Sequence, residues 1–459
     1  MYHHHSERHC ASERRRRRLG EPMRFLTPKQ LTHNRHTPPP PSSRTAVTRA
    51  TATQRAFLHS SRAPMALTFA HSAAATRAHA VRRDKPSTAN AATKRASVRC
   101  AAGGGAASLK SKIANHRWST DIDPWVLNKS DCALEDGERL ILSVPATSAN
   151  MGPGFDCFGF AVDVRNDLII ERGDFGIDIE GEGEDELPRD ETNAIYEAVK
   201  VGFEAARPGM TLPRNLKFTS VNRIPPARGL GSSSAALVSG LAAGLALGGK
   251  DVDAPRTKQI LLQLASDIEG HPDNVAPAIY GGFQISINTD NQWITQRVSC
   301  PKDVQTVLFI PKFKSLTAET RAQLSTTLSV QDAVFNISRA GLLVNAFATG
   351  NLELLSYATQ DTIHQPIRGK PFKLDSLIDA ALKAGAAGCF MSGAGPTVLA
   401  VVGGHGGEIE NDTAGTFKAS RVADAMLETS RSNNVDGEVV IASPTETGVT
   451  AWIESSTWA

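Results

Sequence analysis

A run of small residues, Pro226–Ala236 (PARGLGSSSAA), stands directly before an apolar stretch that is typical of a buried helix. Small residues at the start of a helix leave backbone N–H groups accessible, and the helix dipole adds partial positive charge, so a phosphate can bind there. Gly229 and Gly231 permit positive φ and close approach of the backbone. The hydroxyls of Ser232–Ser234 can cap the helix, contact phosphate oxygens or ligate Mg²⁺. The segment therefore predicts a phosphate-binding loop, although a serine-capped core helix would need only part of this pattern.

This loop differs from the two commonest nucleotide-binding sequences. It contains no lysine and no G-x-x-x-x-G-K-[ST] string, and it lacks the G-x-G-x-x-G spacing. The nucleotide would thus be held by backbone N–H groups and hydroxyls rather than by a lysine.

Strands and helices on either side must position this loop, and both are indicated from about Asp136 onward. Apolar or alternating runs predict strands at Leu140–Val144, Asp167–Glu171, Gly176–Glu180, Leu216–Val221 and Val304–Ile310, a strand–loop–strand over Gly388–Val402, and a last hairpin starting at Gly437–Ile441. Helical spacing predicts helices at Arg256–Glu269, Gln331–Thr349, Leu374–Ala384 and Val422–Ser430. Strands and helices mix without a strict βαβ period, which favours an α+β fold over a doubly wound sheet.

Charge divides the 459 residues into a basic leader and an acidic body. Residues 1–110 carry 21 Lys and Arg against four acidic residues, and the remainder carries 29 against 43. The leader is rich in Arg, Ser, Thr, Ala and Pro without a sustained hydrophobic period, so we expect it to be disordered. This composition is typical of a transit peptide, and the alternative is a basic tail that binds nucleic acid through Arg14–Arg18.

The end of the leader is similar to a chloroplast processing site. Val98–Ala101 (VRCA) matches the pattern at which transit peptides are cut, and we expect cleavage after Cys100 and a location in the plastid stroma. Met65 opens a compact leader of its own, so it and Met23 are alternatives to Met1 as the translation start.

The remaining composition excludes several classes of protein. The six cysteines form no C-x-x-C pair, which indicates neither a disulfide scaffold nor a zinc site and favours a reducing compartment. The longest apolar run, Ala235–Gly249, is shorter than the roughly 20 residues that span a membrane. We therefore expect no membrane as partner, and the acidic body favours an enzyme that does not bind nucleic acid.

Three motifs in order resemble those of the GHMP kinases, which comprise galacto-, homoserine, mevalonate and phosphomevalonate kinases. Val144–Asp163 (VPATSANMGPGFDCFGFAVD) is similar to the first motif, Pro226–Ala236 to the second (P-x-x-x-G-L-G-S-S) and Gly388–Val398 (GCFMSGAGPTV) to the third (S-G-x-G-P-T). The resemblance covers residues 138–459. It implies a kinase that transfers the γ-phosphate of ATP to an alcohol.

The resemblance also implies an architecture of two α+β domains with the active site in the cleft between them. After a leader at 1–100 and a linker at 101–136, the ATP-binding N-terminal domain would cover 137–303 and be like domain 2 of ribosomal protein S5. The C-terminal domain would cover 304–459 and be ferredoxin-like. Family membership further implies a homodimer.

Other segments resemble the homoserine kinases within this superfamily. Ile268–Gly282 (IEGHPDNVAPAIYGG) is similar to E-G-x-x-D-N-V-A-P-A-x-x-G-G, Leu316–Leu324 (LTAETRAQL) to T-x-x-x-R-x-x-L, and His364–Lys370 (HQPIRGK) to H-Q-P-Y-R, with Ile367 in place of Tyr. The catalytic Asp of mevalonate kinases is absent. The resemblance thus implies phosphorylation of L-homoserine in threonine biosynthesis. The alternatives are another plastid GHMP kinase, such as the diphosphocytidyl-methylerythritol kinase, and a non-catalytic GHMP-fold sensor.

The resemblance assigns ATP and Mg²⁺ as cofactors. Glu269 and, among the loop serines, Ser233 are expected to ligate Mg²⁺. The expected ATP-binding residues are Pro226, Ala227, Arg228, Gly229, Leu230, Gly231, Ser232, Ser233, Ser234, Ala235, Ala236, Gly393 and Gly395.

Homoserine brings an ammonium, a carboxylate and a hydroxyl. Arg321 and Arg368 are the candidates for the carboxylate, because a guanidinium binds carboxylate as a fork. Asp156 and Asn150 are the candidates for the ammonium.

Asn274 is expected to position the reacting hydroxyl, with His271 beside it as a further substrate contact. Asn274, Glu269 and Arg321 form the predicted catalytic set, and no dedicated general base is implied. Asp273 is set aside as a base because its spacing from Glu269 differs from the mevalonate kinase pattern, and His364 receives no role.

Overall fold

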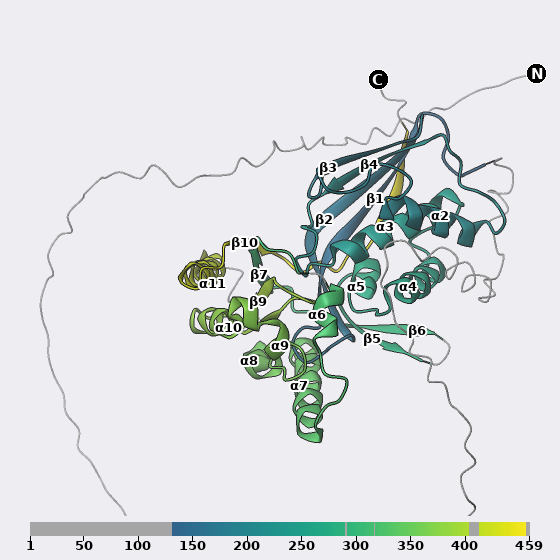
Figure 1. Cartoon of the computed structure of the whole chain (residues 1–459). Coiled ribbons are helices and arrows are strands. Elements are labelled where there is room, and N and C mark those ends of the chain that lie inside the picture. Colours follow the sequence, from purple (N-terminus) through teal and green to yellow (C-terminus); the bar gives the residue numbers. More distant parts are fainter. Residues whose placement is uncertain (1–130, 290–291, 316, 404–412, 456–459) are drawn as a thin grey trace, which may run out of the picture. The chain divides into compact units, whose positions relative to one another are not determined.

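The described residues form two β-sheets with helices packed against them (Figure 1). The computed structural model describes residues 131–289, 292–315, 317–403 and 413–455. They all belong to one compact unit, Thr93–Ala459. The leader 1–100 with its cleavage site, and nearly all of the predicted linker, lie outside the described residues. None of the described helices has the length and apolar character needed to cross a membrane.

The larger sheet has seven strands. They are β1 (Glu138–Ala149), β2 (Phe158–Arg172), β3 (Gly176–Gly181), β4 (Leu216–Asn222), β5 (Phe283–Asn288), β6 (Trp293–Val298) and β11 (Thr450–Ser455). The order is β11-β1-β2-β4-β3, and β5 pairs with the start of β2 and with β6. All pairings are antiparallel except the parallel pair β3–β4, which α2 connects.

Four helices accompany this sheet and form its core with it. They are α2 (Ala194–Ala206), α3 (Ser232–Leu247), α4 (Pro255–Glu269) and α5 (Val275–Tyr280). Asn193 caps α2 by accepting a hydrogen bond from the N–H of Ile195 at 2.9 Å. Helix α3 is apolar around most of its circumference because it lies between β1 and α2. A Cβ atom on Gly244 would lie 2.2 Å from the carbonyl oxygen of Val199, so glycine permits this close packing of α3 on α2.

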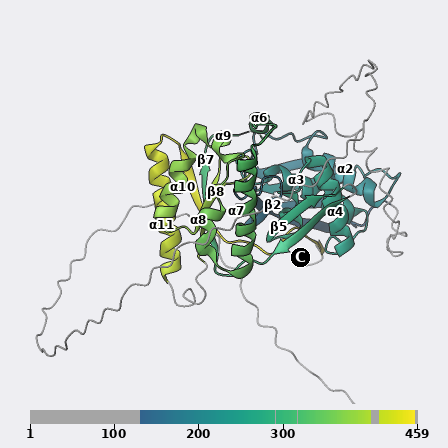
Figure 2. The ribbon, with the colours of Figure 1, turned by 90° about the horizontal axis from the view of Figure 1, so that it is seen from below.

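The smaller sheet has the order β10-β7-β9-β8, built from β7 (Gln305–Pro311), β8 (Gly388–Met391), β9 (Val398–Val402) and β10 (Gly437–Ala442). All three pairings are antiparallel. Helices α10 (Leu374–Lys383) and α11 (Thr413–Ser432) pack on it (Figures 1 and 2). The first and second strands, like the third and fourth, are joined through helices, which is the βαββαβ arrangement of ferredoxin-like domains. The prediction of an α+β fold with a ferredoxin-like second domain is therefore confirmed.

Between β7 and β8 the chain forms further helices before α10, of which α6 carries Arg321 and α9 carries Arg368. They are α6 (Thr317–Ala322), α7 (Val330–Thr349), η2 (Leu352–Leu354), α8 (Leu355–Ala358), α9 (Gln365–Arg368) and η3 (Lys370–Phe372). Ser329 caps α7 by accepting from the N–H of Asp332 at 3.0 Å.

The end of the chain corrects the predicted domain boundary. The strand predicted at Gly437–Ile441 does not open a hairpin, since β10 pairs with β7 in the smaller sheet whereas β11 pairs with β1 in the larger one. Residues 304–459 are thus not one domain, and the last strand completes the N-terminal sheet. The link is held in place by Arg165, whose guanidinium donates to the carbonyl oxygens of Thr447 and Gly448.

Two local boundaries also differ from prediction. Strand β1 continues to Ala149 rather than ending at Val144, because the small polar residues that follow are buried between neighbouring elements. At the other end, Cys132 and Leu134 are buried in the core, so the folded body begins before residue 137.

Candidate active site

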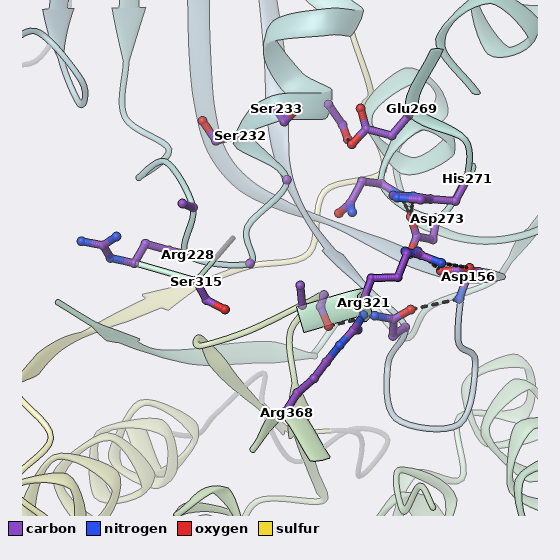
Figure 3. A pocket seen from close by; sticks show the side chains of 18 residues that line it. Asp156, Arg228, Ser232, Ser233, Glu269, His271, Asp273, Ser315, Arg321 and Arg368 are labelled. Atoms are coloured by element: carbon purple, nitrogen blue, oxygen red, sulfur yellow. Dashed lines mark hydrogen bonds and ion pairs between the residues drawn. The ribbon is translucent and has the colours of Figure 1, made fainter. Parts of the chain in front are cut away.

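A pocket lies where the start of α3, the turn after β1 and the α4–α5 connection meet the loops of the smaller sheet (Figure 3). Most of the predicted site residues line it: Asn150, Asp156, Ala227, Arg228, Gly229, Gly231, Ser232, Ser233, Ser234, Glu269, His271, Asn274, Arg321, Arg368 and Gly393. In Figure 3, Ser232, Ser233 and Glu269 lie on one side, and Asp156, Arg321 and Arg368 on the other.

The phosphate loop has the geometry that its glycines predict. Gly231 precedes α3 in the left-handed region (φ 69°, ψ 23°), no side chain caps the helix, and no acidic residue stands in its first turn. The first N–H groups of a helix lack intrahelical acceptors, so they remain available to an anion. A Cβ on Gly231 would lie 1.9 Å from Oγ1 of Thr147, and one on Gly229 would lie 2.3 Å from the carbonyl oxygen of Ser392.

Five predicted ATP-binding residues do not line the pocket. They are Pro226, Leu230, Ala235, Ala236 and Gly395. Leu230 and Ala235 are buried in the core. Arg228 lines the pocket but directs its guanidinium away from the other labelled side chains, toward the carbonyl oxygen of Lys312 (Figure 3). Leu230 and Ala235 thus anchor the loop in the core and do not line the pocket.

The third motif holds the phosphate loop from the side of the smaller sheet. The Ser392 hydroxyl donates to the carbonyl oxygen of Gly229 at 2.6 Å, and the N–H of Thr397 donates to that of Arg228 at 3.1 Å. The motif therefore fixes the position of the loop, and Gly393 and Ala394 reach the pocket themselves.

Asn150, which the sequence analysis assigned to a substrate ammonium, forms hydrogen bonds to two backbone groups in this structure. Its side-chain N–H donates to the carbonyl oxygen of Gly393 at 2.8 Å, and its Oδ1 accepts from the N–H of Asp156 at 3.0 Å. The side chain is buried and joins the first motif to the third.

Glu269 ends α4 with its carboxylate toward the start of α3. Its Oε1 accepts a hydrogen bond from the Ser234 hydroxyl at 3.2 Å, and burial raises the pKa of the carboxyl. The predicted partner Ser233 is exposed at the same end of the helix. A carboxylate and hydroxyls are oxygen donors that suit Mg²⁺, which is commonly held by one or two carboxylates and the substrate phosphates. No cluster of three His, Cys, Asp or Glu side chains that could hold a metal occurs in the described part of the chain, so phosphate oxygens would have to complete such a site.

His271 and Asp273 form an ion pair beside Glu269. Nδ1 of His271 lies 2.7 Å from Oδ1 of Asp273. Burial alone would lower the pKa of His271, but the hydrogen bond and the charge of Asp273 outweigh it and raise the pKa to about 9. The imidazolium is therefore the form at neutral pH, and it places positive charge in the pocket.

Asn274 follows directly at the start of α5. Its Oδ1 accepts from the Thr147 hydroxyl at 2.8 Å, and its N–H donates to Oδ1 of Asp273 at 2.8 Å. These bonds fix the orientation of the amide that was predicted to position the reacting hydroxyl.

Asp156 and Arg321 form a two-pronged ion pair. Nη1 and Nη2 of Arg321 donate to the two carboxylate oxygens at 2.7 and 2.6 Å. The sequence analysis assigned Arg321 to the carboxylate and Asp156 to the ammonium of homoserine. In this structure the two side chains bind each other. A bound zwitterion would exchange partners with this pair.

Arg368 differs from Arg321 because its guanidinium is buried without matching acceptors. The residue is 5% exposed, and its Nε and Nη2 have no hydrogen-bond partner among the described residues. Burial, and after it the charge of Arg321, lowers the pKa of Arg368 to about 10, so the group stays protonated at neutral pH. A buried, charged donor without an acceptor is costly, and an anionic ligand would offset that cost.

Comparison with known proteins places this geometry in a family. The chain matches the family models "GHMP kinases N terminal domain" at residues 193–282 and "GHMP kinases C terminal" at 346–428. It is 38% identical over 308 residues to a homoserine kinase of Carboxydothermus hydrogenoformans, covering 66% of this chain and 94% of that protein. It is 40% identical over 304 residues to a homoserine kinase of Moorella thermoacetica, covering 66% and 99%.

The chain belongs to the homoserine kinase family of the GHMP kinases. A solved structure of a homoserine kinase from Cytophaga hutchinsonii supports the fold, with a TM-score of 0.59, 25% identity, and coverage of 71% of this chain and all of that one. The ATP-dependent GHMP kinase fold predicted from the motifs is thus confirmed.

Three residues of this GHMP kinase pocket were missed by the sequence analysis. They are Asp273, Ser315 and Ala394. Asp273 was weighed only as a base, yet its position two residues after His271 could have indicated the ion pair. Ser315 precedes α6 and donates its N–H to the carbonyl oxygen of Ala227 at 2.9 Å, a contact that no sequence pattern marks.

Proposed function

We propose that this GHMP kinase transfers the γ-phosphate of ATP to the hydroxyl of L-homoserine, giving O-phospho-L-homoserine for threonine synthesis. The observation that carries the substrate is the buried guanidinium of Arg368, whose Nε and Nη2 face no acceptor among the described residues. A substrate carboxylate supplies two oxygens in the geometry of a guanidinium fork. The relatives at 38–40% identity are named homoserine kinases, which supports the same substrate.

The proposed pose places the two ends of homoserine on the two members of the ion pair. Its carboxylate lies against Arg368 and Arg321, and its ammonium takes the carboxylate of Asp156. The hydroxyl then points toward Asn274, whose amide is held by the Thr147 hydroxyl.

The phosphates of ATP occupy the start of α3, where the first-turn N–H groups and the serine hydroxyls donate to them. Phosphoryl transfer depends mainly on position and charge compensation, so the chain needs little covalent chemistry of its own. The imidazolium of His271 adds positive charge beside the transferred group. Asp273 is not a free base, because its Oδ1 accepts from both His271 and the N–H of Asn274.

Mg²⁺ is the proposed metal, held by Glu269 and a serine hydroxyl of the loop together with the phosphates. When bound it would neutralise charge on the transferring phosphoryl group. Ser234 already donates to Glu269, so we propose it beside Ser233 as a candidate ligand.

We propose a plastid location for the processed protein, beginning after Cys100, and the basic, acid-poor leader supports this. A homodimer is proposed on family resemblance alone. Import of the full chain into isolated chloroplasts and N-terminal sequencing of the product would test the first proposal, and sedimentation velocity the second.

The test of function is ADP release by the protein purified from Ala101, with Mg-ATP and a panel of L-homoserine, mevalonate, galactose and diphosphocytidyl-methylerythritol. Turnover with homoserine alone is the expected result. Activity only on another alcohol would keep the kinase and reject the substrate. ATP binding without turnover of any panel member would favour a non-catalytic sensor.

A further inference from the structure

Two arginines of the pocket, Arg321 and Arg368, share a neighbour that the proposed mechanism does not use. Cζ of Arg321 and Cζ of Arg368 each lie 5.3 Å from the ring centroid of Phe155. The ring is part of the turn between β1 and β2, next to Asp156. A cation near an aromatic face is attracted by the ring's quadrupole, so one ring serves two guanidinium groups here.

This support matters because the two guanidinium groups carry like charges, and two nitrogens of the Arg368 guanidinium lack hydrogen-bond partners among the described residues. The pKa of Arg368 is lowered first by burial and then by the charge of Arg321, because a nearby positive charge disfavours protonation. Arg321 is oriented by its fork on Asp156. Arg368 has no such fork, since its Nε and Nη2 have no partner among the described residues, so packing must orient it.

The ring of Phe155 is itself held by a buried histidine. His364 lies against it with the ring centroids 5.4 Å apart and the planes tilted by 36°. Nε2 of His364 lies 2.8 Å from the carbonyl oxygen of Gly152, three residues before Phe155, and donates to it. Gly152 packs closely on Thr359, since a Cβ there would lie 2.3 Å from the carbonyl oxygen of Thr359.

His364 also stands one helical turn before Arg368. The N–H of Arg368 donates to the carbonyl oxygen of His364 at 3.0 Å, so the two residues share a face of the chain. The position of His364 is fixed in turn by Asp361, whose Oδ2 accepts from the backbone N–H groups of His364 and Gln365. Burial lowers the pKa of His364, against the charge of Asp361, whose Oδ2 lies 3.6 Å from Nε2. Nε2 carries a proton toward Gly152 because a carbonyl oxygen can only accept.

We propose that Phe155 is a positioning residue for the substrate carboxylate, that its ring supports both guanidinium groups, and that His364 locks the turn that carries it. This inference rests on the proposed function and deepens it, because it concerns the carboxylate end of homoserine. Neither residue lines the pocket that holds the phosphate loop and Asn274, so their effect should appear in homoserine binding and not in ATP binding.

The first test replaces Phe155 and measures KM and kcat for both substrates. Phe155→Leu should raise the KM for homoserine about tenfold, as expected from losing two cation–π contacts, with the KM for ATP and kcat within about twofold of wild type. Phe155→Tyr keeps an aromatic face and should restore the wild-type KM. Phe175→Leu is the matched control, since that ring is 38% exposed and packs on Tyr196 and Phe218.

Two ligands separate the carboxylate from the rest of the substrate. 4-Hydroxybutanoate retains the carboxylate and lacks the ammonium, so its inhibition constant should rise in Phe155→Leu. 3-Aminopropan-1-ol lacks the carboxylate, so its inhibition constant should be the same in both proteins. Equal weakening of both ligands, or a KM for ATP that rises in parallel, would mean a general distortion and would overturn the proposal.

A second pair of variants tests His364 by atom position. The amide nitrogen of Gln lies near the place of imidazole Nε2, and that of Asn near Nδ1, so only His364→Gln keeps the donor to Gly152. We expect His364→Gln to hold the KM for homoserine within about threefold and His364→Asn to raise it like Phe155→Leu. Equal KM values in the two variants would reject the lock. Wild-type protein that phosphorylates no homoserine would reject the proposed function and this inference with it, whereas active wild type with an unchanged Phe155→Leu rejects only the inference.

Discussion

At the scale of single residues, two ion pairs satisfy four charged side chains of the pocket, and Arg368 belongs to neither pair. Asp156 satisfies Arg321, and Asp273 satisfies His271. Arg368 keeps two donors without acceptors, at 5% exposure. A substrate with a carboxylate would supply acceptors to the Arg368 guanidinium, whereas a neutral alcohol would leave this buried cation unpaired.

Replacing Arg368 should act on homoserine alone. Arg368→Ala is expected to raise the KM for homoserine by about 10- to 150-fold, which corresponds to the loss of a charged hydrogen-bonded contact of about 1.5–3 kcal/mol. Arg368→Lys keeps the charge without the guanidinium fork, so its KM for homoserine should lie between those of wild type and Arg368→Ala. Steady-state kinetics with each substrate varied would measure this. A matching rise in the KM for ATP would contradict the assignment.

The His271–Asp273 pair should make stability depend on pH. The pKa of His271 is raised from 6.5 to about 9 in the folded protein, so its stabilisation is complete below about pH 6.5 and is lost as the pH rises through about 9. The loss is on the order of 3 kcal/mol, counting about 1.4 kcal/mol for each pH unit of the shift. Urea unfolding of wild type and His271→Gln from pH 6 to pH 9.5 would measure it. A wild-type slope equal to that of the variant over this range would contradict the raised pKa.

Residue-level prediction succeeded where a function is local in sequence and failed where it depends on a distant partner. The phosphate loop is a continuous string, and its glycines are required by contacts that positive φ makes possible. The pairing of Asp156 with Arg321 joins residues far apart in the chain, and the sequence gives no measure of that distance. Asn150 lines the predicted pocket, but its amide hydrogen bonds to backbone groups of the first and third motifs, which the sequence did not indicate.

At the scale of elements, the glycines of α2 and α3 set how close the two helices lie. A Cβ atom on Gly202 would lie 2.2 Å from the carbonyl oxygen of Leu241, and one on Gly244 would lie 2.2 Å from that of Val199. Helix α3 begins with the phosphate loop, so its packing on α2 also fixes where the loop stands. Prediction found α3 by its apolar run, but it missed α2, α5 and the β5–β6 hairpin, whose identity depends on the neighbours they pack against.

A glycine-to-alanine pair should separate packing from helix propensity. Gly244→Ala is expected to destabilise the protein by about 1–3 kcal/mol because the added methyl group meets backbone. Gly341→Ala, in the middle of α7 with open space at the Cβ position, should stabilise it by about 0.5–1 kcal/mol. Urea unfolding of the two variants measures both signs. Two changes of the same sign would contradict the close packing of α2 on α3.

At the scale of the whole described body, the ferredoxin-like sheet is an insertion between strands of the larger sheet. The chain leaves the larger sheet after β6 and returns to it with β11, on the edge of β1. No property of the last strand marks this, because alternation predicts a strand and not its partner. That is why the sequence analysis placed a single boundary within the folded body, at 303, and did not predict that the last strand joins the larger sheet.

Removing the last strand should lower the stability of the whole folded body. A protein that ends at Ala442 lacks β11 and the buried Val449, leaves one edge of β1 unpaired, and deprives Arg165 of two carbonyl acceptors. We expect a lower urea midpoint and exposure of apolar surface to a hydrophobic dye, relative to a protein that ends at Ser455. An unchanged midpoint would show that the return adds nothing to stability.

The same return has a consequence for synthesis on the ribosome. Domains generally fold as their residues emerge, with the N-terminal one first. Here the first sheet cannot close until its final strand leaves the exit tunnel, after the ferredoxin-like part has already been made. During translation the nascent chain therefore carries β1 with one unpaired edge until the residues of β11 have emerged.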